Sequence, residues 1–219
     1  HSCLLHIPDR FSEGYGPNIA ALQKLKENGA RLIITVDCGI TAHEPLAEAA
    51  AQNMDILVID HHKAGPTLPI ATAVVNPNRL DDDSQLGYLC AAGVCFLVLA
   101  GVMRECRVRQ ITPPSGTMPD LLTLLDIVGL ATVCDVVPLQ DINRVFVKQG
   151  LKILATRQNI GLRHLCDVAG LATSPTTHTL GFLLGPRINA GGRLGQSDLG
   201  IQLLTAQDAD IAGSLASRL

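Results

Sequence analysis

The sequence predicts an α/β fold in which a parallel sheet flanked by helices is followed by a helical subdomain and a connector helix. Short runs of β-branched and aliphatic residues alternate with helical patterns up to Asn76, as consecutive βαβ units do. After Asn76 the apolar residues recur at helical spacing. The composition, with 47% hydrophobic and 17% charged residues, is typical of a globular chain and excludes disorder, collagen and coiled coil.

Four strands are expected in the first 76 residues. Cys3–Ile7 is a short apolar run that ends at Pro8-Asp9. Leu32–Val36 and Ile56–Ile59 are apolar at successive positions, as strands buried on both faces are. Ala73–Asn76 is the fourth candidate.

Two helices are expected between these strands. Pro17 suits the first position of a helix that Asn28-Gly29 ends, and a second helix runs from about Glu44 to Gln52. The regular alternation of strand, helix and strand indicates right-handed crossovers within one parallel sheet.

The rest of the chain is predicted to be helical, with Asp141 as the N-cap of one helix. Gly185–Gly195 is rich in glycine and basic residues and is interpreted as a loop, and Asp198–Leu219 as one or two helices. The expected division is a domain over residues 1–195 and the start of a connector over 196–219. The predicted helices are Leu89–Cys106, Asp120–Thr132, Ile142–Thr156, Leu162–Val168 and His178–Leu184.

Charge and composition restrict the partners. The net charge is −3, aromatic residues make up 3%, and Trp is absent, so neither a global basic surface nor a rich base-stacking surface is expected. The apolar part of residues 84–103 is too short for a comfortable membrane span. The seven cysteines include no CxxC pair and are interpreted as buried thiols of a cytoplasmic protein.

Polar side chains follow two of the predicted strands directly. Asp37 follows one strand, and Asp60, His61 and His62 follow the next. Because the carboxyl ends of parallel strands line the crevice where ligands bind, these four side chains are expected within a few ångströms of one another. Carboxylates and imidazoles together suit Mn²⁺, Mg²⁺ or Fe²⁺. Cys38 is not counted as a ligand, since strand alternation turns it away from Asp37.

A third candidate is Asp135, which lies in an apolar segment between a helix end and Pro138. A carboxylate in such a place is costly unless it is paired, hydrogen-bonded or bound to metal. Each signal also has a purely structural interpretation, because an Asp at a strand end can cap a turn and a His pair can be structural. Together they favour a metal site.

These motifs resemble those of the DHH phosphoesterases: Val36–Gly39, Asp60-His61-His62 and the segment around Asp135. Two further segments, Ile7–Gly16 and Gly185–Gly195, are similar to those of the RecJ family of single-strand-specific 5′→3′ exonucleases within that superfamily. The resemblance covers essentially the whole chain, and its last motif is the specific one.

The resemblance implies roles for individual residues. Asp37 would bridge two divalent cations, Mn²⁺ in the first place and Mg²⁺ as the alternative. His61 and Asp135 would ligate the second cation. His62 would contact the phosphate or support the site, and Asp60 would orient a histidine. The resemblance therefore places His62 and Asp60 among the catalytic residues.

Three residues of the last motif would face the substrate. Arg187, Asn189 and Arg193 would bind the DNA backbone near the scissile phosphate, and Arg187 would also stabilise developing charge. Without the resemblance, Arg187 and Arg193 would be taken as solvated loop charges. In a two-metal site a bridging water attacks phosphorus in line, with no covalent enzyme intermediate.

The resemblance implies that the chain binds single-stranded DNA and no membrane. A single-strand-binding protein and a helicase are the two alternatives for a protein partner. The family's first motif, Asp-x-Asp-x-Asp-Gly, is absent from this sequence. The chain, which begins without Met, is therefore expected to be an inactive slice of a longer nuclease that acts in DNA repair and recombination.

Three rival functions remain. One is another DHH phosphoesterase that acts on short or small phosphate substrates, and a second is a non-catalytic DHH scaffold that binds DNA or replication proteins. The third, a Rossmann-like nucleotide binder, is disfavoured because no GxGxxG follows the first strand.

Overall fold

The computed structural model describes residues 3–9, 12–114, 116–192 and 196–219. The chain divides into two compact units, His1–Cys95 and Phe96–Leu219, each with its own hydrophobic core. The α/β class expected from the sequence is confirmed, with a parallel sheet in the first unit and helices in the second. The predicted division at residue 195 stays a prediction.

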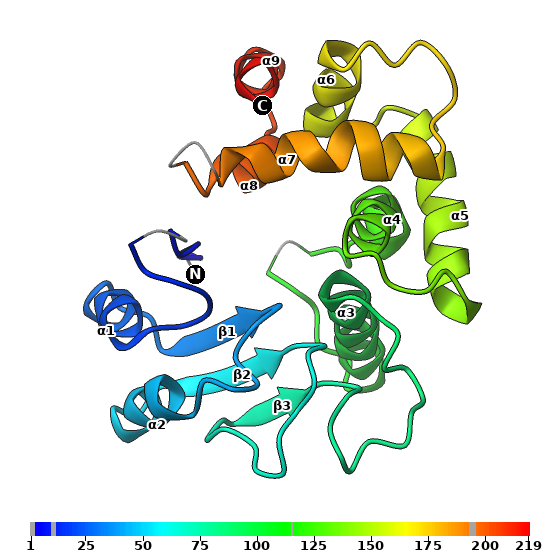
Figure 1. The fold of residues 1–219 in the computed structure, drawn as a ribbon. Helices are drawn as coiled ribbons and strands as arrows, with labels where there is room; N and C mark the ends of the chain where they lie inside the picture. The colour runs from blue at the N-terminus through cyan, green and yellow to red at the C-terminus, as the bar shows by residue number, and fades with distance from the viewer. Residues whose placement is uncertain (1–2, 10–11, 115, 193–195) are drawn as a thin grey trace. The chain divides into compact units, whose positions relative to one another are not determined.

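The described part of the first unit contains one parallel sheet of three strands in the order β1-β2-β3 (Figure 1). These are β1 (Leu32–Val36), β2 (Asp55–Ile59) and β3 (Ala73–Val75). Val36 pairs with Ile59, and Ile59 pairs with Val75. The carboxyl ends of the strands therefore meet at one edge of the sheet.

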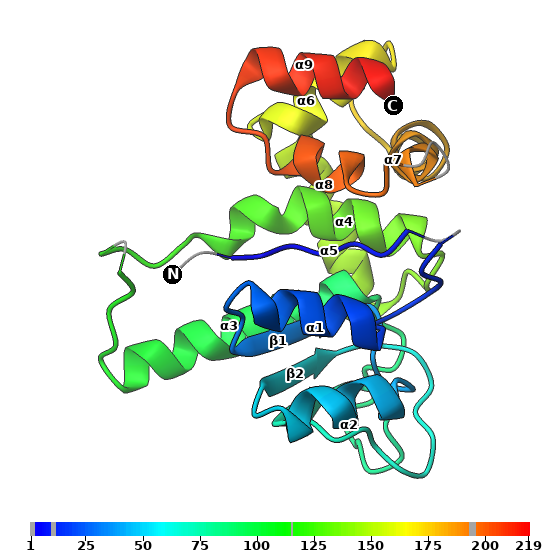
Figure 2. The same ribbon diagram turned by 90° about the vertical axis from the view of Figure 1, so that its left-hand side faces the viewer.

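Two helices cover one face of this sheet: α1 (Ile19–Glu27) and α2 (His43–Ala51), which lie together in front of the strands in Figure 2. Helix α1 begins at Ile19, not at Pro17, and Asn18 is its N-cap: the Asn18 side chain accepts the backbone N–H of Ala21 at 2.8 Å. The core between helices and strands consists of Leu22, Ile33, Leu46, Ala49, Met54, Ile56 and Val58.

Two further predictions for this unit are wrong. Cys3–Ile7 is not a strand, since it pairs with none of the described strands and lies mostly exposed. Leu32–Val36 is buried on one face only, and its alternate residues Leu32, Ile34 and Val36 are about half exposed, at 53%, 51% and 52%. The physical reason is that β1 ends the described sheet and α1 and α2 cover a single face.

The second unit is helical, and α3 begins in the first unit and continues into it. The segment expected over Asp120–Thr132 is split into a 3₁₀ turn and a helix, with Asp120 capping the turn by accepting the N–H of Leu122. The elements are α3 (Ala91–Val108), η1 (Leu121–Leu124), α4 (Leu125–Cys134), α5 (Asp141–Ala155), α6 (Ile160–Val168), the π-helix η2 (Thr179–Leu184), α7 (Gly185–Gly191), α8 (Leu199–Leu204) and α9 (Ala209–Arg218).

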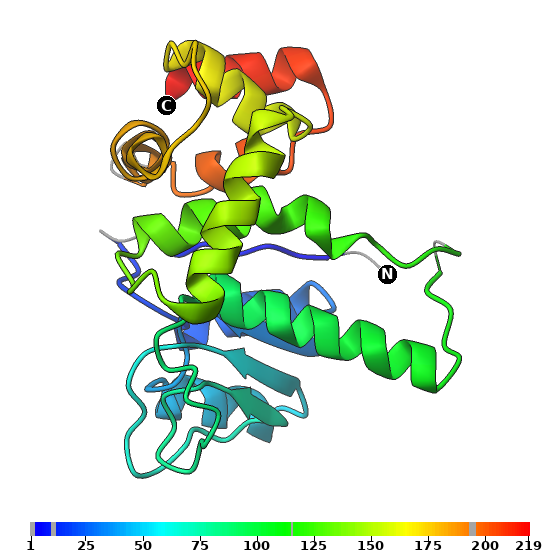
Figure 3. The same ribbon diagram turned by 90° about the vertical axis from the view of Figure 1, so that its right-hand side faces the viewer.

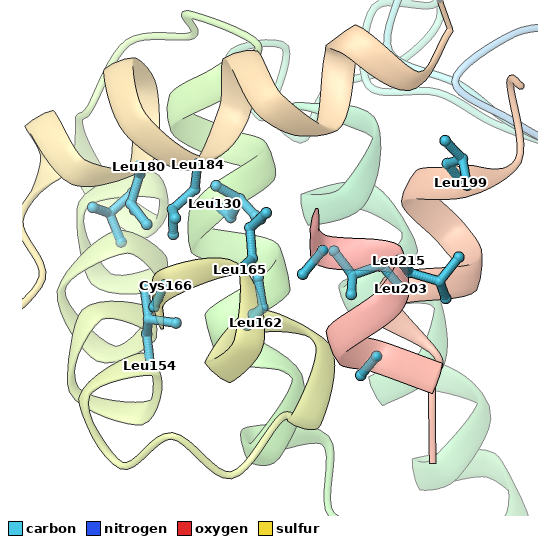
Figure 4. Packing of buried hydrophobic residues seen from close by; sticks show 13 residues of the cluster. Leu130, Leu154, Leu162, Leu165, Cys166, Leu180, Leu184, Leu199, Leu203 and Leu215 are labelled. Carbon is cyan, nitrogen blue, oxygen red and sulfur yellow. The ribbon is translucent and has the colours of Figure 1, made fainter. Parts of the chain in front are cut away.

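Leucine side chains dominate the core of this unit. Figure 4 shows side chains from α4, α5, α6, η2, α8 and α9 meeting in one cluster. Helix α5 crosses α4 closely (Figure 3), because Gly129 and Gly150 face each other at the crossing. The buried cluster comprises Leu130, Val147, Leu154, Leu162, Leu165, Cys166, Leu180, Leu184, Leu199, Leu203, Ala212, Leu215 and Ala216.

Two expectations for the second unit also need correction. Asp141 is the first residue of α5 and not its N-cap. The N-cap position is taken by Gln140, whose side chain makes no capping hydrogen bond. Gly185–Gly191 is helical, although its glycines suggested a loop. It continues η2 without a break, and Pro186 lies at the junction of the two elements. The helical character expected over Asp198–Leu219 is confirmed, and of the one or two helices expected there the structure has two, α8 and α9.

Candidate metal centre

Asp37, His61 and His62 converge at the carboxyl edge of the sheet. Asp37 follows β1 directly, and the two histidines follow β2 after Asp60. One ligand atom from each of the three lies within 4.8 Å of the others. The proximity expected from parallel pairing is therefore observed.

His61 is held so that one ring nitrogen faces the cluster. Its Nδ1 lies 3.0 Å from the carbonyl oxygen of Leu89, which can only accept, so Nδ1 carries the proton. Its Nε2 lies 3.2 Å from Asp37 Oδ1, and the His61 side chain is 13% exposed. The lone pair of Nε2 is thereby directed at the position that a cation beside Asp37 would take.

Asp60 ties the two strand-end loops together. Its Oδ2 accepts the N–H of Ile40, in the loop after β1, at 3.0 Å. Its Oδ1 accepts the N–H groups of His61 (2.7 Å) and His62 (3.2 Å) and lies 2.7 Å from His62 Nδ1. Burial by itself raises the pKa of the Asp60 carboxyl, but these hydrogen bonds, with that of His62 the largest, leave the pKa below its ordinary value. Asp60 is therefore an ionised acceptor that keeps the proton of His62 on Nδ1.

The His62 ring is supported on two sides. It meets His61 edge-on with ring centroids 4.6 Å apart, and Tyr15 edge-on at 5.9 Å. Since Asp60 occupies Nδ1, the second nitrogen, Nε2, is the atom that His62 can present to a ligand. The side chain is 48% exposed, so a ligand from solvent can reach it.

The backbone at Asp37 is in the left-handed region, with φ of 61°. Such a conformation is uncommon outside glycine and is best tolerated by Asn and Asp. The Tyr15 hydroxyl donates a hydrogen bond to the Asp37 carbonyl. Gly39, with φ of 109°, lies where a Cβ would come within 2.5 Å of the Thr35 hydroxyl, so glycine is required for this turn.

The donor set fits a divalent cation such as Mn²⁺ or Mg²⁺. One carboxylate and two imidazoles, each imidazole fixed through its other nitrogen, are the oxygen and nitrogen donors that such cations accept. Cys38 is no competitor. Burial raises the pKa of its thiol to about 11, and the charges of Asp60 and Asp37 add to the effect.

The seven cysteines are all free, but they are not uniformly buried. Cys90 and Cys166 are buried and Cys3 is exposed, whereas the remaining four are partly buried. The prediction of free thiols is therefore correct, and the prediction of burial holds for only some of them.

Asp135 lies in the second unit, at the C-terminal end of α4. Asp135 is exposed, so the cost of a buried carboxylate that the sequence suggested does not arise there. The next residue, Val136, is 88% exposed and has φ of 58°, which is strained for a β-branched side chain. The buried carboxylate of this helix is instead Asp126, in its first turn.

Arg187 and Asn189 lie on α7 in the second unit. Arg187 is half-buried and Asn189 is exposed, and no ion pair of Arg187 occurs among the described residues. A Cβ on Gly185 would come within 2.4 Å of Cys134 Sγ, so this glycine allows α7 to begin close to the end of α4 that carries Asp135. Arg193 lies outside the described residues.

The sequence reasoning missed Tyr15, Asn76 and Asn78, which support the cluster. Asn76 directly follows β3 and Asn78 comes two residues later, at the same edge of the sheet as Asp37 and His61. Polar residues at the end of a third parallel strand are the signal that could have found them.

Comparison with known proteins places this cluster in a family. The DHH family, N-terminal domain, matches residues 1–127, which include all three clustered residues. The chain belongs to the DHH family. Its name-giving run is Asp60-His61-His62.

Among curated proteins, this DHH chain is similar to single-stranded-DNA-specific exonucleases named RecJ. It is 39% identical to that of Dickeya dadantii, over 97% of this chain and 38% of the relative. It is 37% identical to that of Bacillus subtilis, over 98% of this chain and 26% of the relative. The chain thus spans well under half the length of either relative.

Solved structures agree with this DHH assignment. A crystal structure of exonuclease RecJ bound to manganese has a TM-score of 0.82 at 34% identity, covering 96% of this chain and 51% of that one. The Thermus thermophilus RecJ in complex with Mn²⁺ has a TM-score of 0.74 at 32% identity, over 91% of this chain and 28% of that one.

Within the described residues, no helix has the length and apolar character needed to cross a membrane.

Proposed function

We propose that this chain carries the phosphodiesterase site of a metal-dependent exonuclease that degrades single-stranded DNA from the 5′ end to mononucleotides, in DNA repair and recombination. The observation that carries the proposal is the convergence of Asp37, His61 and His62 within 4.8 Å, with both rings held through Nδ1. The names of the relatives support DNA as the substrate class.

In this proposal Asp37, His61 and Asp135 are the metal ligands, and two divalent cations bind. The relatives whose structures contain Mn²⁺ support manganese as the first choice, and one with Mg²⁺ supports magnesium as the alternative. Bound divalent cations would lower the pKa of a water and polarise the phosphate. Asp37 supplies an oxygen donor, and His61 supplies a nitrogen donor whose ring is already held through Nδ1, so that it costs little reorganisation when the substrate arrives.

Asp60 and His62 act together on the substrate side. Asp60, ionised and buried, keeps the proton on His62 Nδ1 and holds the ring in one orientation. The partly exposed His62 can then meet a phosphate oxygen or a cation through Nε2. This division explains why one carboxylate is buried while the other, Asp37, has a side chain that is 62% exposed.

Arg187, Asn189 and Arg193 are proposed to bind the DNA backbone. The guanidinium of Arg187 can bind phosphate oxygens through two parallel N–H donors and stabilise the charge that develops during cleavage. The proposed setting is the cytoplasm, and a single-strand-binding protein or a helicase is the proposed kind of protein partner.

The experiment compares 5′-labelled and 3′-labelled single-stranded DNA, each with Mn²⁺ or with EDTA. It uses both the 219-residue chain and the complete product of its gene. Wild type is tested beside Asp135→Ala and the matched control Asp210→Ala, which removes an exposed carboxylate from the first turn of α9. From the complete product we expect mononucleotides from the 5′ end only with Mn²⁺, a loss of about 100-fold or more in Asp135→Ala, and full activity in the control. From the 219-residue chain, whose sequence contains no Asp-x-Asp-x-Asp-Gly motif, we expect none.

Two results would contradict this proposal. DNA that is bound but never cut by either wild-type preparation would indicate a non-catalytic scaffold. Cleavage of short oligonucleotides or small phosphodiesters in preference to long DNA would indicate a different DHH phosphoesterase. Equal activity in Asp135→Ala and Asp210→Ala would remove Asp135 from the metal ligands.

A further inference from the structure

A short segment after β3 holds the backbone of both histidines of the metal centre. The side-chain amide of Asn76 donates to the carbonyl of His62 at 2.8 Å, and that of Asn78 donates to the carbonyl of His61 at 2.6 Å. The two asparagines are linked, since the N–H of Asn78 donates to Asn76 Oδ1 at 2.7 Å. Asn76 is 2% exposed, so its hydrogen bonds lie out of competition with water.

Asn78 has a second contact, which connects it with the orientation of the His61 ring. Its amide also donates to the carbonyl of Gly87 at 3.0 Å. Gly87 is two residues before Leu89, whose carbonyl accepts from His61 Nδ1. One carboxamide thus holds the backbone of His61 and the segment that fixes its ring.

The close approach of Gly87 indicates that this contact is specific. A Cβ at position 87 would lie 2.4 Å from Asn78 Oδ1 and 3.3 Å from its Cγ. No residue with a side chain fits there unless the Asn78 carboxamide moves. Gly87 and Asn78 therefore form one packing unit with His61.

We infer that Asn78, supported by Asn76, is a positioning residue of the metal centre: it fixes His61 so that Nδ1 holds the proton and Nε2 faces Asp37. The inference rests on the proposed function in so far as His61 is a cation ligand. Hydrogen-bonded partners of metal-binding histidines fix the tautomer and ring direction, and their loss commonly weakens metal binding by about 10- to 100-fold.

The test replaces Asn78 with Asp, which keeps the size of the side chain but removes the N–H donor and places a charge against two carbonyls. Mn²⁺ binding to the whole chain is measured by EPR of the free ion. We expect Asn78→Asp to weaken it by about 10- to 100-fold. The matched control is Asn28→Asp, since Asn28 donates to a carbonyl in the same way, to Lys24 at 2.8 Å, at the end of α1.

A second measurement does not require metal. Side-chain ¹⁵N NMR of His61 in wild type is expected to show a protonated Nδ1 and an unprotonated Nε2. Asn78→Asp is expected to show a mixture of both tautomers, and Asn28→Asp the wild-type pattern. Gly87→Ala, which displaces the carboxamide without changing Asn78, is expected to repeat the effect and replaces Asn78→Asp if that variant does not fold.

The outcomes separate this inference from the proposed function. If wild type fails to bind Mn²⁺, the metal site of the proposed function is wrong, and the tautomer pattern decides the role of Asn78. If folded Asn78→Asp or Gly87→Ala keeps the wild-type tautomer at His61, the positioning role is wrong, whatever the activity on DNA. Mn²⁺ affinity equal to that of wild type in either folded variant would also overturn it.

Discussion

Asp60 and Asp126 are both buried carboxylates, yet their surroundings shift the pKa in opposite directions. The Asp60 carboxyl receives hydrogen bonds from His62 and from three backbone N–H groups, which outweigh its burial and lower its pKa. Burial raises the pKa of the Asp126 carboxyl, and the backbone N–H of Ile127, 2.7 Å from Oδ1, compensates only in part. The fold thus stabilises the ionised form of Asp60, whereas ionisation of Asp126 lowers the stability of the fold.

Asp126→Asn is expected to stabilise the second unit near neutral pH. Asparagine keeps an oxygen for the Ile127 N–H and removes the buried charge, for a gain of about 1 kcal/mol in the free energy of unfolding. Because the folded-state pKa of Asp126 is raised, the wild type loses stability as the pH rises through that pKa. The advantage of the variant should therefore shrink as the pH falls from neutrality through the raised pKa of Asp126 toward the ordinary range of a carboxyl group.

Urea unfolding at several pH values, followed by circular dichroism, measures this difference. Asp210→Asn, an exposed first-turn carboxylate of α9, serves as the control and should show no such pH dependence. A stability difference that stays constant with pH would mean that the Asp126 carboxyl does not titrate as described.

Among the elements, the crossing of α4 and α5 depends on two small residues. A Cβ on Gly150 would come within 2.3 Å of the Leu125 carbonyl and 3.2 Å of Gly129 Cα. These are backbone atoms, which cannot rotate away as a flexible side chain can. The distance between the helices is therefore set by glycine on both sides.

Gly150→Ala is expected to cost about 1–3 kcal/mol in the free energy of unfolding, because the methyl group forces the two helices apart. Gly101→Ala, in the exposed interior of α3, meets no atom within 4 Å and should gain about 0.5–1 kcal/mol from the better helix propensity of alanine. Thermal and urea unfolding compare the two variants. A Gly150→Ala protein as stable as Gly101→Ala would show that the crossing is not tightly packed.

For the whole molecule, the division into two units means that a cation at the carboxyl edge of the sheet should first stabilise the unit His1–Cys95. Asp37, His61 and His62 come from the ends of β1 and β2, so opening of either strand disperses the donors. Binding that requires the folded unit stabilises it by mass action.

Mn²⁺ at about 100 times its Kd is expected to add about 2.7 kcal/mol to the free energy of opening in this unit. Hydrogen exchange of the β1 and β2 amides, with Mn²⁺ and with EDTA, measures the change. Asp37→Ala should remove the protection, whereas Asp83→Ala, an exposed carboxylate of the same unit, should retain it. Protection that survives in Asp37→Ala would show that Mn²⁺ binds elsewhere.

Much of the metal centre could be predicted from local patterns. Runs such as Leu32–Val36 and Ile56–Ile59 favour strands through their β-branched residues, and parallel pairing brings the residues after them to one edge. The same local reasoning failed at Asp135 and at Gly185–Gly191. Exposure at a helix end and the continuation of η2 into a glycine-containing helix depend on packing, not on the local pattern.

The sequence by itself therefore determined the α/β class, the parallel strands and the residues Asp37, His61 and His62 that meet at their ends. Only the tertiary structure decided how these side chains are held: Asp60 joins two loops, the Leu89 carbonyl selects the His61 tautomer, and Asn78 holds the backbone. The reason is physical. Strand-forming runs have a residue-type signature within a few positions, whereas a hydrogen bond to a backbone carbonyl 28 residues away can be made to any residue type and leaves no trace in the sequence.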